Sequence, residues 1–156
     1  MTALHDLPAQ DLLAAYRQRT LSPVEVTQAV LAHMERWEPH IRATYLLRPE
    51  HALAQARASE ARWLRGEPQG LLDGVPVTIK ENIATQGDPT PLGTAAVPLV
   101  PATADAPPAA RLREAGAVMV AKTTMPDYGM LSSGLSSFHP LSRNPWDVSK
   151  GPGGSS

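Results

Sequence analysis

The sequence predicts an α/β fold, and three features of the 156-residue chain carry that prediction. Apolar residues recur at helical spacing through the first third, up to about Gly66. Residues 75–80 then alternate between apolar and other side chains, which is the period of a strand. Farther on, a short expected helix is followed at once by the apolar run 117–121, which is typical of a buried strand. A strand, a helix and a second strand in this order indicate α/β layering.

The first third is expected to hold three helices, over residues 8–19, 22–39 and 49–66. The second is the best marked, because Ser22 and Glu25 form a capping box in which each side chain accepts a hydrogen bond from the other's backbone. Pro39 is expected to end it, since proline lacks the backbone N–H that a helix needs. Residues 1–66 are therefore predicted to be helical, and residues 67–156 to begin the α/β core.

The rest of the chain mixes short elements with long loops. Pro76 is compatible with the first strand only if the proline lies at the start of the strand or the strand lies at a sheet edge. Residues 84–104 show no period and predict a long loop. Asp105 is expected to cap a helix that runs through Ala115, and Gly116 to end it. Residues 126–156 are rich in Gly, Pro and Ser, which is typical of loops.

The composition excludes several classes of function. The net charge of -1 argues against a dedicated nucleic-acid binder. The sequence holds no apolar run of about 18 residues and no secretory signal, so neither a membrane protein nor a secreted one is expected. The absence of cysteine removes disulfides, a thiolate nucleophile and Cys-ligated metals, and suits the cytoplasm. The histidines lack metal-ligand spacing, so no metal and no cofactor are predicted.

Lys80 is the first candidate catalytic residue, at the end of the first strand. One interpretation is an ordinary strand-end lysine that reaches solvent. The other is a buried lysine kept neutral as a general base, which requires its pKa to fall by about 3 units, at a cost of roughly 4 kcal/mol. Residues 78, 80 and 82 share one face of the strand, and Glu81 points the other way.

Two serine-rich segments also invite a catalytic interpretation. Residues 151–156, Gly-Pro-Gly-Gly-Ser-Ser, form either a flexible tail or a site where glycines let a ligand approach the backbone. The group of Ser132, Ser133, Ser136 and Ser137 lies close to His139, but the chain has no G-x-S-x-G nucleophile elbow. A loop therefore explains that second group better than a Ser–His hydrolase does.

Taken together, the motifs resemble the amidase signature family. Residues 72–82, Leu-Asp-Gly-Val-Pro-Val-Thr-Ile-Lys-Glu-Asn, are similar to its lysine motif, and residues 153–156 to its glycine–serine signature. Segments 101–106, 111–117, 122–126 and 143–147 are similar to the family in order and spacing, and the Ser22 helix fits its N-terminal region. Thr94 departs from the usual serine, and Gly151 from the usual residue before Pro152.

The resemblance implies an amidase with a mixed central sheet flanked by helices and a Ser–Ser–Lys triad. Lys80 would be the base, and Ser155 the bridging serine, which the family holds through a cis peptide bond. Gly129 and Met130 correspond to the segment that lines the acyl pocket, so these two residues and Ser155 are the expected substrate-binding residues. The substrate would be a small-molecule amide.

The family's nucleophilic serine and oxyanion hole follow the Gly-Gly-Ser-Ser motif, and the sequence stops at Ser156. The chain is therefore expected to be the N-terminal part of one amidase domain and to be inactive alone. Two alternatives stay open: the A subunit of an amidotransferase that acts on misacylated tRNA, and a non-catalytic truncated protein that only binds a partner. Direct contact with nucleic acid or membrane is not expected, and homodimer formation stays open.

Overall fold

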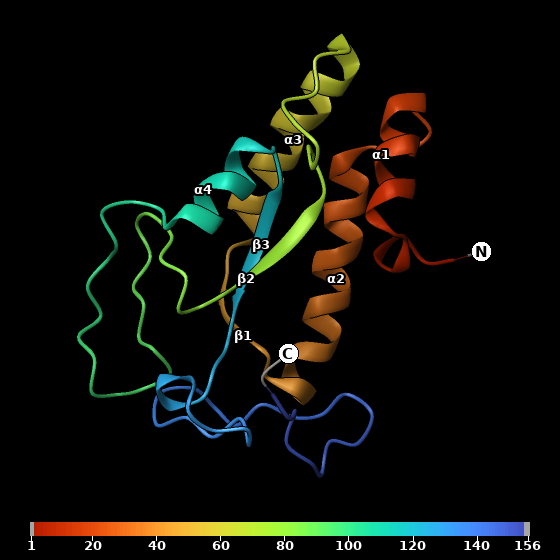
Figure 1. Cartoon of the computed structure of the whole chain (residues 1–156). Helices are drawn as coiled ribbons and strands as arrows, with labels where there is room; N and C mark the ends of the chain where they lie inside the picture. The colour runs from red at the N-terminus through yellow and green to blue at the C-terminus, as the bar shows by residue number, and fades with distance from the viewer. Residues whose placement is uncertain (1, 155–156) are drawn as a thin grey trace. The chain divides into compact units, whose positions relative to one another are not determined.

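The computed structural model describes residues 2–154 and shows a mixed α/β fold (Figure 1). Its helices are α1 (Ala9–Gln18), α2 (Pro23–Ile41), α3 (Pro49–Arg65) and α4 (Pro107–Glu114), with 3-10 turns η1 (Leu4–Asp6) and η2 (Asp127–Gly129). Its strands are β1 (Thr44–Leu47), β2 (Pro76–Lys80) and β3 (Val118–Thr123), in the sheet order β1-β3-β2.

The sheet is mixed because β3 pairs differently with its two neighbours. β1 is antiparallel to β3, with Leu47 opposite Ala121 and an irregularity after Thr44. On the other side, the Val118 N–H donates to the Val75 carbonyl at 2.9 Å, and the Glu81 N–H to the Thr123 carbonyl at 3.0 Å. Residue numbers rise together along these two segments, so β2 and β3 are parallel. The predicted α/β class is confirmed.

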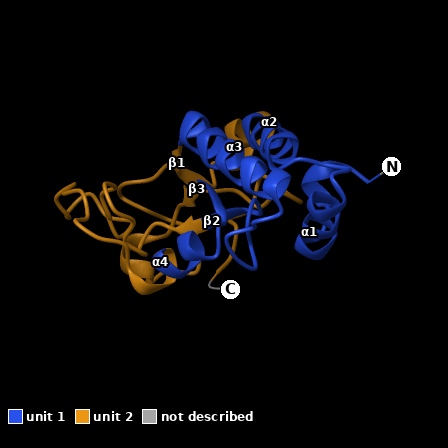
Figure 2. Ribbon diagram, turned by 90° about the horizontal axis from the view of Figure 1, so that it is seen from above, with its two compact units in different colours: residues 1–35, 48–78, 110–120 blue, residues 36–47, 79–109, 121–156 orange. Residues whose placement is uncertain are grey.

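The chain forms two compact units, shown in different colours in Figure 2. Unit 1 comprises residues 1–35, 48–78 and 110–120, and unit 2 comprises residues 36–47, 79–109 and 121–156. The chain passes between the units within α2, β2, α4 and β3, and also between the end of β1 and the start of α3. Lys80 belongs to unit 2, as do the long loops that follow β2 and β3.

Unit 1 contains two apolar clusters that the helical segments build. One joins α1, α2 and α3 through Leu12, Tyr16, Val26 and Trp63. The other packs Ala52 and Ala56 of α3 against Val118 and Val120 of β3, with the apolar side of α2 beside them. Small alanines on α3 allow the helix to lie close to the strand. These clusters hold the first half of β3 in place, and β3 is the strand on which the sheet is centred.

The helix boundaries show which sequence signals predict the start or end of a helix correctly. The capping box is confirmed, because the Ser22 N–H donates to Glu25 at 2.8 Å and the Glu25 N–H donates to Ser22 Oγ at 3.1 Å. The end of α3 is also confirmed, with Gly66 at φ +75°. Pro39, however, does not end α2, which continues to Ile41. The Arg42 N–H still reaches the Glu38 carbonyl at 2.9 Å, so the last turn tolerates the proline.

Two further expectations differ from the structure. The segment 1–66, predicted as helical, also contains the strand β1 between α2 and α3. Asp105 does not cap a helix directly after it, because α4 begins at Pro107 and the Asp105 carboxylate accepts the Gln86 N–H at 2.7 Å. That bond ties the loop before α4 to the loop after β2. The absence of helix and strand from residues 84–104 is as predicted.

Asp73, which is fully buried, anchors the segment between α3 and β2 in unit 1. Its carboxylate accepts Arg62 Nε at 2.9 Å, Arg62 Nη2 at 2.5 Å and the Gln69 N–H at 2.7 Å. Burial opposes ionisation of Asp73, but the hydrogen bonds from Arg62 and Gln69 outweigh it and hold the pKa of Asp73 below its ordinary value. The Asp73 carbonyl also accepts the Trp63 indole N–H at 3.1 Å.

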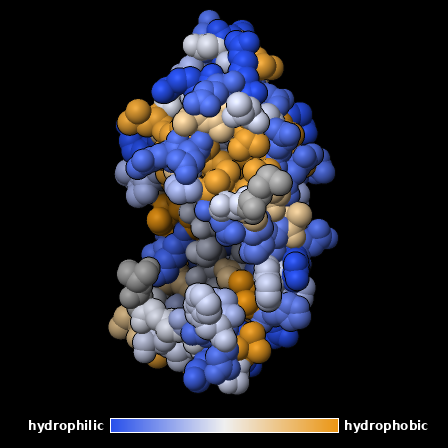
Figure 3. All heavy atoms as spheres, turned by 90° about the vertical axis from the view of Figure 1, so that its right-hand side faces the viewer, coloured by the Kyte–Doolittle hydropathy of each residue, from blue (hydrophilic) through white to orange (hydrophobic). Residues whose placement is uncertain are grey.

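The surface carries scattered apolar side chains, some of which are visible on the face in Figure 3. Trp146 is 94% exposed, Leu71 88% and Met130 82%. Hydrophilic residues lie between the apolar ones on this face (Figure 3). Within residues 2–154, none of the helices is both long enough and apolar enough to span a bilayer.

Asp73→Asn is expected to lower the free energy of unfolding by about 1.5–3 kcal/mol at pH 7, because it removes the charge that Arg62 and the Gln69 amide stabilise. Since the folded pKa of Asp73 lies below the unfolded one, the carboxylate stabilises the fold above about pH 4. That stabilisation is lost as the pH falls through the folded pKa. Urea unfolding at pH 7 and at pH 3 measures both effects, and the two proteins should converge at low pH.

The matched control is Glu67→Gln, which breaks the exposed pair between Glu67 and Arg65 at 3.1 Å. Solvent screens that pair, so no measurable change is expected. Equal losses in the two variants would contradict the anchoring role of Asp73.

Candidate active site

Lys80 lines a pocket of about 390 Å³ in unit 2. The pocket brings together the end of β2, the end of β3 and the C-terminal loops. Its lining residues are Ile41, Ala43, Lys80, Thr123, Thr124, Met125, Pro126, Leu131, Gly134, Ser142, Arg143, Pro145, Pro152, Gly153 and Gly154. Among the described residues that line it, the charged side chains are those of Lys80 and Arg143, and none is an aspartate or a glutamate.

The strand places Lys80 and its neighbours in different environments. Ile79 and Glu81 are buried, whereas Lys80 is half-buried and reaches the pocket. This alternation is the period of a strand, in which successive side chains point to opposite faces. Lys80 is thus neither a solvent lysine nor a fully enclosed one. It is a pocket-lining amine at the end of a strand.

The pocket also receives the glycine-rich segment from the other end of the chain. Gly153 and Gly154 line it together with Lys80, although more than 70 residues separate them in the sequence. Both glycines have positive φ, +79° and +130°. Ser155, the predicted bridging serine, lies outside the described residues. The structure therefore brings the lysine motif to the start of the glycine–serine motif.

The other two predicted substrate-binding residues lie elsewhere in the same unit. Gly129 ends η2 and Met130 follows it, and both are exposed. Neither is among the lining residues of the pocket, whereas their neighbours Pro126 and Leu131 are. A role in binding an acyl group stays a prediction for Gly129 and Met130.

Hydroxyl groups line one side of the pocket. Thr124 Oγ1 and Ser142 Oγ lie 2.8 Å apart, and Ser142 Oγ also donates to the Arg42 carbonyl at 2.8 Å. The Thr124 N–H reaches the Ala43 carbonyl at 2.9 Å. These contacts fix the segment after β3 against the segment before β1. Sequence reasoning missed Thr124 and Ser142, because their partners are distant in the chain.

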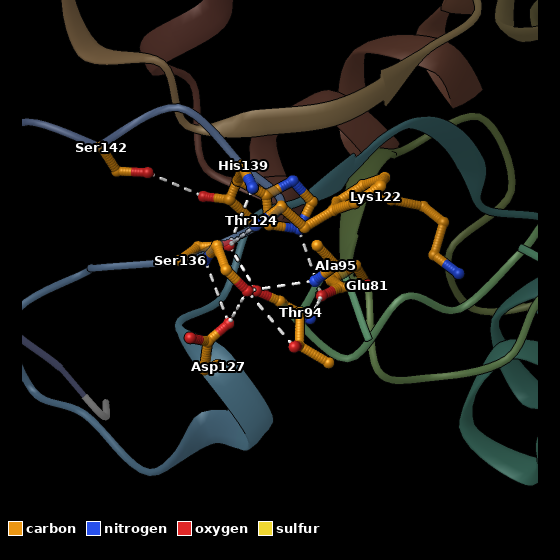
Figure 4. A network of polar contacts seen from close by, with 12 residues as sticks. Glu81, Thr94, Ala95, Lys122, Thr124, Asp127, Ser136, His139 and Ser142 are labelled. Carbon is orange, nitrogen blue, oxygen red and sulfur yellow. Dashed lines mark hydrogen bonds and ion pairs between the residues drawn. The ribbon is translucent and has the colours of Figure 1, made fainter. Parts of the chain in front are cut away.

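A buried carboxylate lies directly after Lys80. Glu81 is fully inaccessible to solvent, and one of its oxygens, Oε1, accepts both the Gly93 N–H and a hydrogen bond from His139 Nε2, the latter at 3.2 Å (Figure 4). The other oxygen, Oε2, has no hydrogen-bond partner among the described residues. A buried acid needs donors because desolvation penalises its charged form. For Glu81, the His139 ring and the Gly93 backbone amide are these donors.

The same network fixes the loop that carries Gly93. Ser136 Oγ donates to the Gly93 carbonyl and accepts the backbone N–H of His139 at 2.8 Å. Next to it, Asp127 Oδ1 accepts the Ser137 hydroxyl at 2.8 Å, and Ser137 Oγ accepts the Ala95 N–H at 3.1 Å (Figure 4). The serines of residues 132–137 thus include two that fasten loops together.

His139 is part of this buried network and not of a Ser–His pair. Its ring contacts Glu81 and lies in edge-to-face contact with Tyr45 and Phe138, with centroids 5.1 Å and 4.9 Å away. Its backbone, not its ring, meets Ser136. The interpretation of the serine-rich segment as a loop is therefore supported by the contacts of His139.

Sequence reasoning identified Lys80 but missed the Glu81–His139 pair. The available signal was the alternation of the strand, which turns Glu81 away from the face of Lys80 and toward the interior. A carboxylate in that position requires a donor, but nothing in the sequence names His139, which is 58 residues away. Within the described part of the chain, His, Asp and Glu side chains form no group of three or more that could hold a metal ion.

Comparisons with known proteins place this chain in a family. The Amidase family matches residues 25–156. The A subunit of the glutamyl-tRNA(Gln) amidotransferase of Chloroflexus aurantiacus is 40% identical over all 156 residues, which correspond to 32% of its own length. The equivalent protein of a Picosynechococcus species is 39% identical, with 31% of its length covered. The chain thus spans about a third of these relatives.

Solved structures agree in fold. A bacterial aryl acylamidase of the amidase signature enzymes superposes with a TM-score of 0.88 at 26% identity, and 99% of this chain covers 32% of it. The peptide amidase of Stenotrophomonas maltophilia gives a TM-score of 0.86 at 30% identity, with 96% of this chain and 32% of the amidase covered. The chain belongs to the amidase signature family.

Gly93→Ala is expected to destabilise the site severely. Gly93 has φ +69°, and an added Cβ would overlap the Pro126 carbonyl group and lie 2.7 Å from the Met125 carbonyl oxygen. The matched control is Gly87→Ala, at φ +84° with nothing within 4 Å, which meets only the backbone strain of about 1–2 kcal/mol. Urea unfolding should show a clearly larger loss for Gly93→Ala. A similar loss in both variants would contradict the tight packing at Gly93.

Proposed function

We propose that this chain supplies part of the active site of an enzyme that cleaves carboxylic amides, with Lys80 as the base. The observation that carries the proposal is the pocket that Lys80 shares with Gly153 and Gly154, the two residues that precede Ser155 in the sequence. Membership of the amidase signature family supports the same chemistry. Ser155 would bridge Lys80 and a nucleophilic serine that follows the Gly-Gly-Ser-Ser motif in the family.

The proposed relay moves one proton in each direction. Neutral Lys80 accepts a proton from Ser155, and Ser155 accepts one from the nucleophilic serine as that oxygen attacks the amide carbon. The C–N bond then breaks, and the proton returns through the same groups to the leaving amine or ammonia. Water hydrolyses the acyl–serine ester to release the acid.

The acyl part of the substrate needs a binding surface next to the catalytic relay. We propose that the backbone of Gly129 and Met130 contributes to it, as in the family. Gly129 has φ +69°, and its position beside Met125, whose Cε would lie 3.2 Å from an added Cβ, connects it to the pocket lining.

Lys80→Ala is expected to lower kcat by about 10³-fold or more in a protein extended through the nucleophilic serine, because the relay loses its base. Turnover of a chromogenic aryl amide and of glutamine measures the effect. Residues 1–156 alone are expected to give no turnover. Unchanged activity in Lys80→Ala would refute the assigned base, and Lys80-dependent turnover by residues 1–156 would refute the need for a later serine.

A second candidate is the A subunit of a glutamine-dependent amidotransferase. The observation in its favour is the 35–40% identity to proteins of that name over the whole chain. In this case ammonia released at the serine would pass to an acyl-tRNA held by partner proteins. The negative net charge of the chain agrees with tRNA contact through a partner and not through this segment.

The two candidates differ in their need for a partner. A component of an amidotransferase is expected to co-purify with the other components, and its glutamine hydrolysis to rise when they are present. An independent amidase is expected to purify alone and to turn over aryl amides at full rate. Affinity purification of the tagged full-length protein, followed by assays with both substrates, separates these outcomes.

A further inference from the structure

We infer that Glu81 and His139 form a positioning pair that holds Lys80 in its place in the pocket. The inference rests on the proposed function, in which Lys80 is the base of the relay. Neither residue lines the pocket, so neither is a catalytic residue. Their effect on catalysis would pass through the backbone of Lys80 and through the loop that carries His139.

The first step concerns how firmly Glu81 itself is fixed. Its side chain has no exposed surface, and Oε1 receives two donors, the Gly93 N–H and His139 Nε2 (Figure 4). Rotating the carboxyl group away would break both bonds and leave a buried polar group without partners, which costs more than losing an exposed contact. Only one orientation of Glu81 is therefore favourable.

The second step connects Glu81 to Lys80. The two residues are adjacent, and the peptide that joins them is held on both sides. The Glu81 N–H donates to the Thr123 carbonyl at 3.0 Å, and the Lys80 carbonyl accepts the Ile83 N–H at 3.0 Å. With Glu81 anchored inward, the alternation of the strand directs Lys80 to the opposite side, where the pocket lies.

The third step connects the pair to the C-terminal part of the pocket lining. In the sequence, His139 lies between Gly134 and Ser142, which both line the pocket, and Arg143 follows Ser142. Tyr45 and Phe138 pack against the His139 ring and limit its movement. The hydrogen bond from His139 to Glu81 thus connects two parts of the pocket lining. One is the loop of residues 134–143, and the other is the end of β2, where Lys80 precedes Glu81.

The central test compares three variants of the full-length enzyme that differ at the hydrogen bond. His139→Phe keeps a ring for Tyr45 and Phe138 but removes the Nε2 group. His139→Gln places an N–H donor near the same position. Glu81→Gln removes the negative charge at nearly constant volume. Asp73→Asn serves as the control, because it disturbs a buried carboxylate that lines no part of the pocket.

The measured quantities are the kcat and KM for an aryl amide and the rate of labelling by a fluorophosphonate, which reports activation of the nucleophilic serine without a known substrate. His139→Phe is expected to lower kcat and the labelling rate by about 10- to 100-fold with KM changed less than about twofold. His139→Gln should recover most of the loss. In the Glu81→Gln background, His139→Phe should cost much less, since the two act as a unit.

Circular dichroism and urea unfolding on the same samples give the folded fraction, to which each rate is normalised. Asp73→Asn should lower stability but leave the normalised kcat unchanged. A normalised kcat for His139→Phe equal to that of the unaltered enzyme, or no recovery in His139→Gln, would overturn the inference. If instead Lys80→Ala retains full activity, the proposed function fails. Loss of activity in Lys80→Ala with none in His139→Phe rejects the positioning pair alone.

Discussion

The parallel pairing of β2 with β3 is the constraint on which the rest of the structure depends. It begins at the Val118 N–H in unit 1 and ends at the Glu81 N–H in unit 2, so it runs the whole length of both strands. In unit 1 it ties β2 to a strand that α2 and α3 bury. In unit 2 it sets where β2 ends, and therefore where Lys80 meets the pocket.

Two buried carboxylates stabilise this arrangement by different chemistry. Asp73 is held by an arginine fork, which provides a full opposite charge and lowers the pKa of the acid. Glu81 is held by a backbone amide and an imidazole, which provide two directional hydrogen-bond donors. The first solution suits a structural anchor between α3 and β2. The second fixes a buried carboxylate directly after a pocket-lining lysine in the chain.

The parts of the fold that the sequence predicted are those with local causes. The Ser22 cap and the Gly66 stop each depend on residues within four positions, and both are confirmed. β1 was missed, because its four residues are all half-buried and show no alternation. The meeting of Lys80 with Gly153 and Gly154 followed from family resemblance and not from local chemistry. The partners of Glu81 lie 12 and 58 residues away, so no local pattern could name them.

The adjacency of Lys80 and Glu81 has a consequence for how this segment can change. Each side chain suits only its own side of the strand. The Lys80 amine lines an open pocket, and the Glu81 carboxyl group lies among buried hydrogen-bond donors. Inserting or deleting a single residue in β2 would exchange the two sides. The acid would then enter the pocket and the amine would be left among N–H donors that it cannot use. This pair of neighbours therefore constrains the number of residues in the strand.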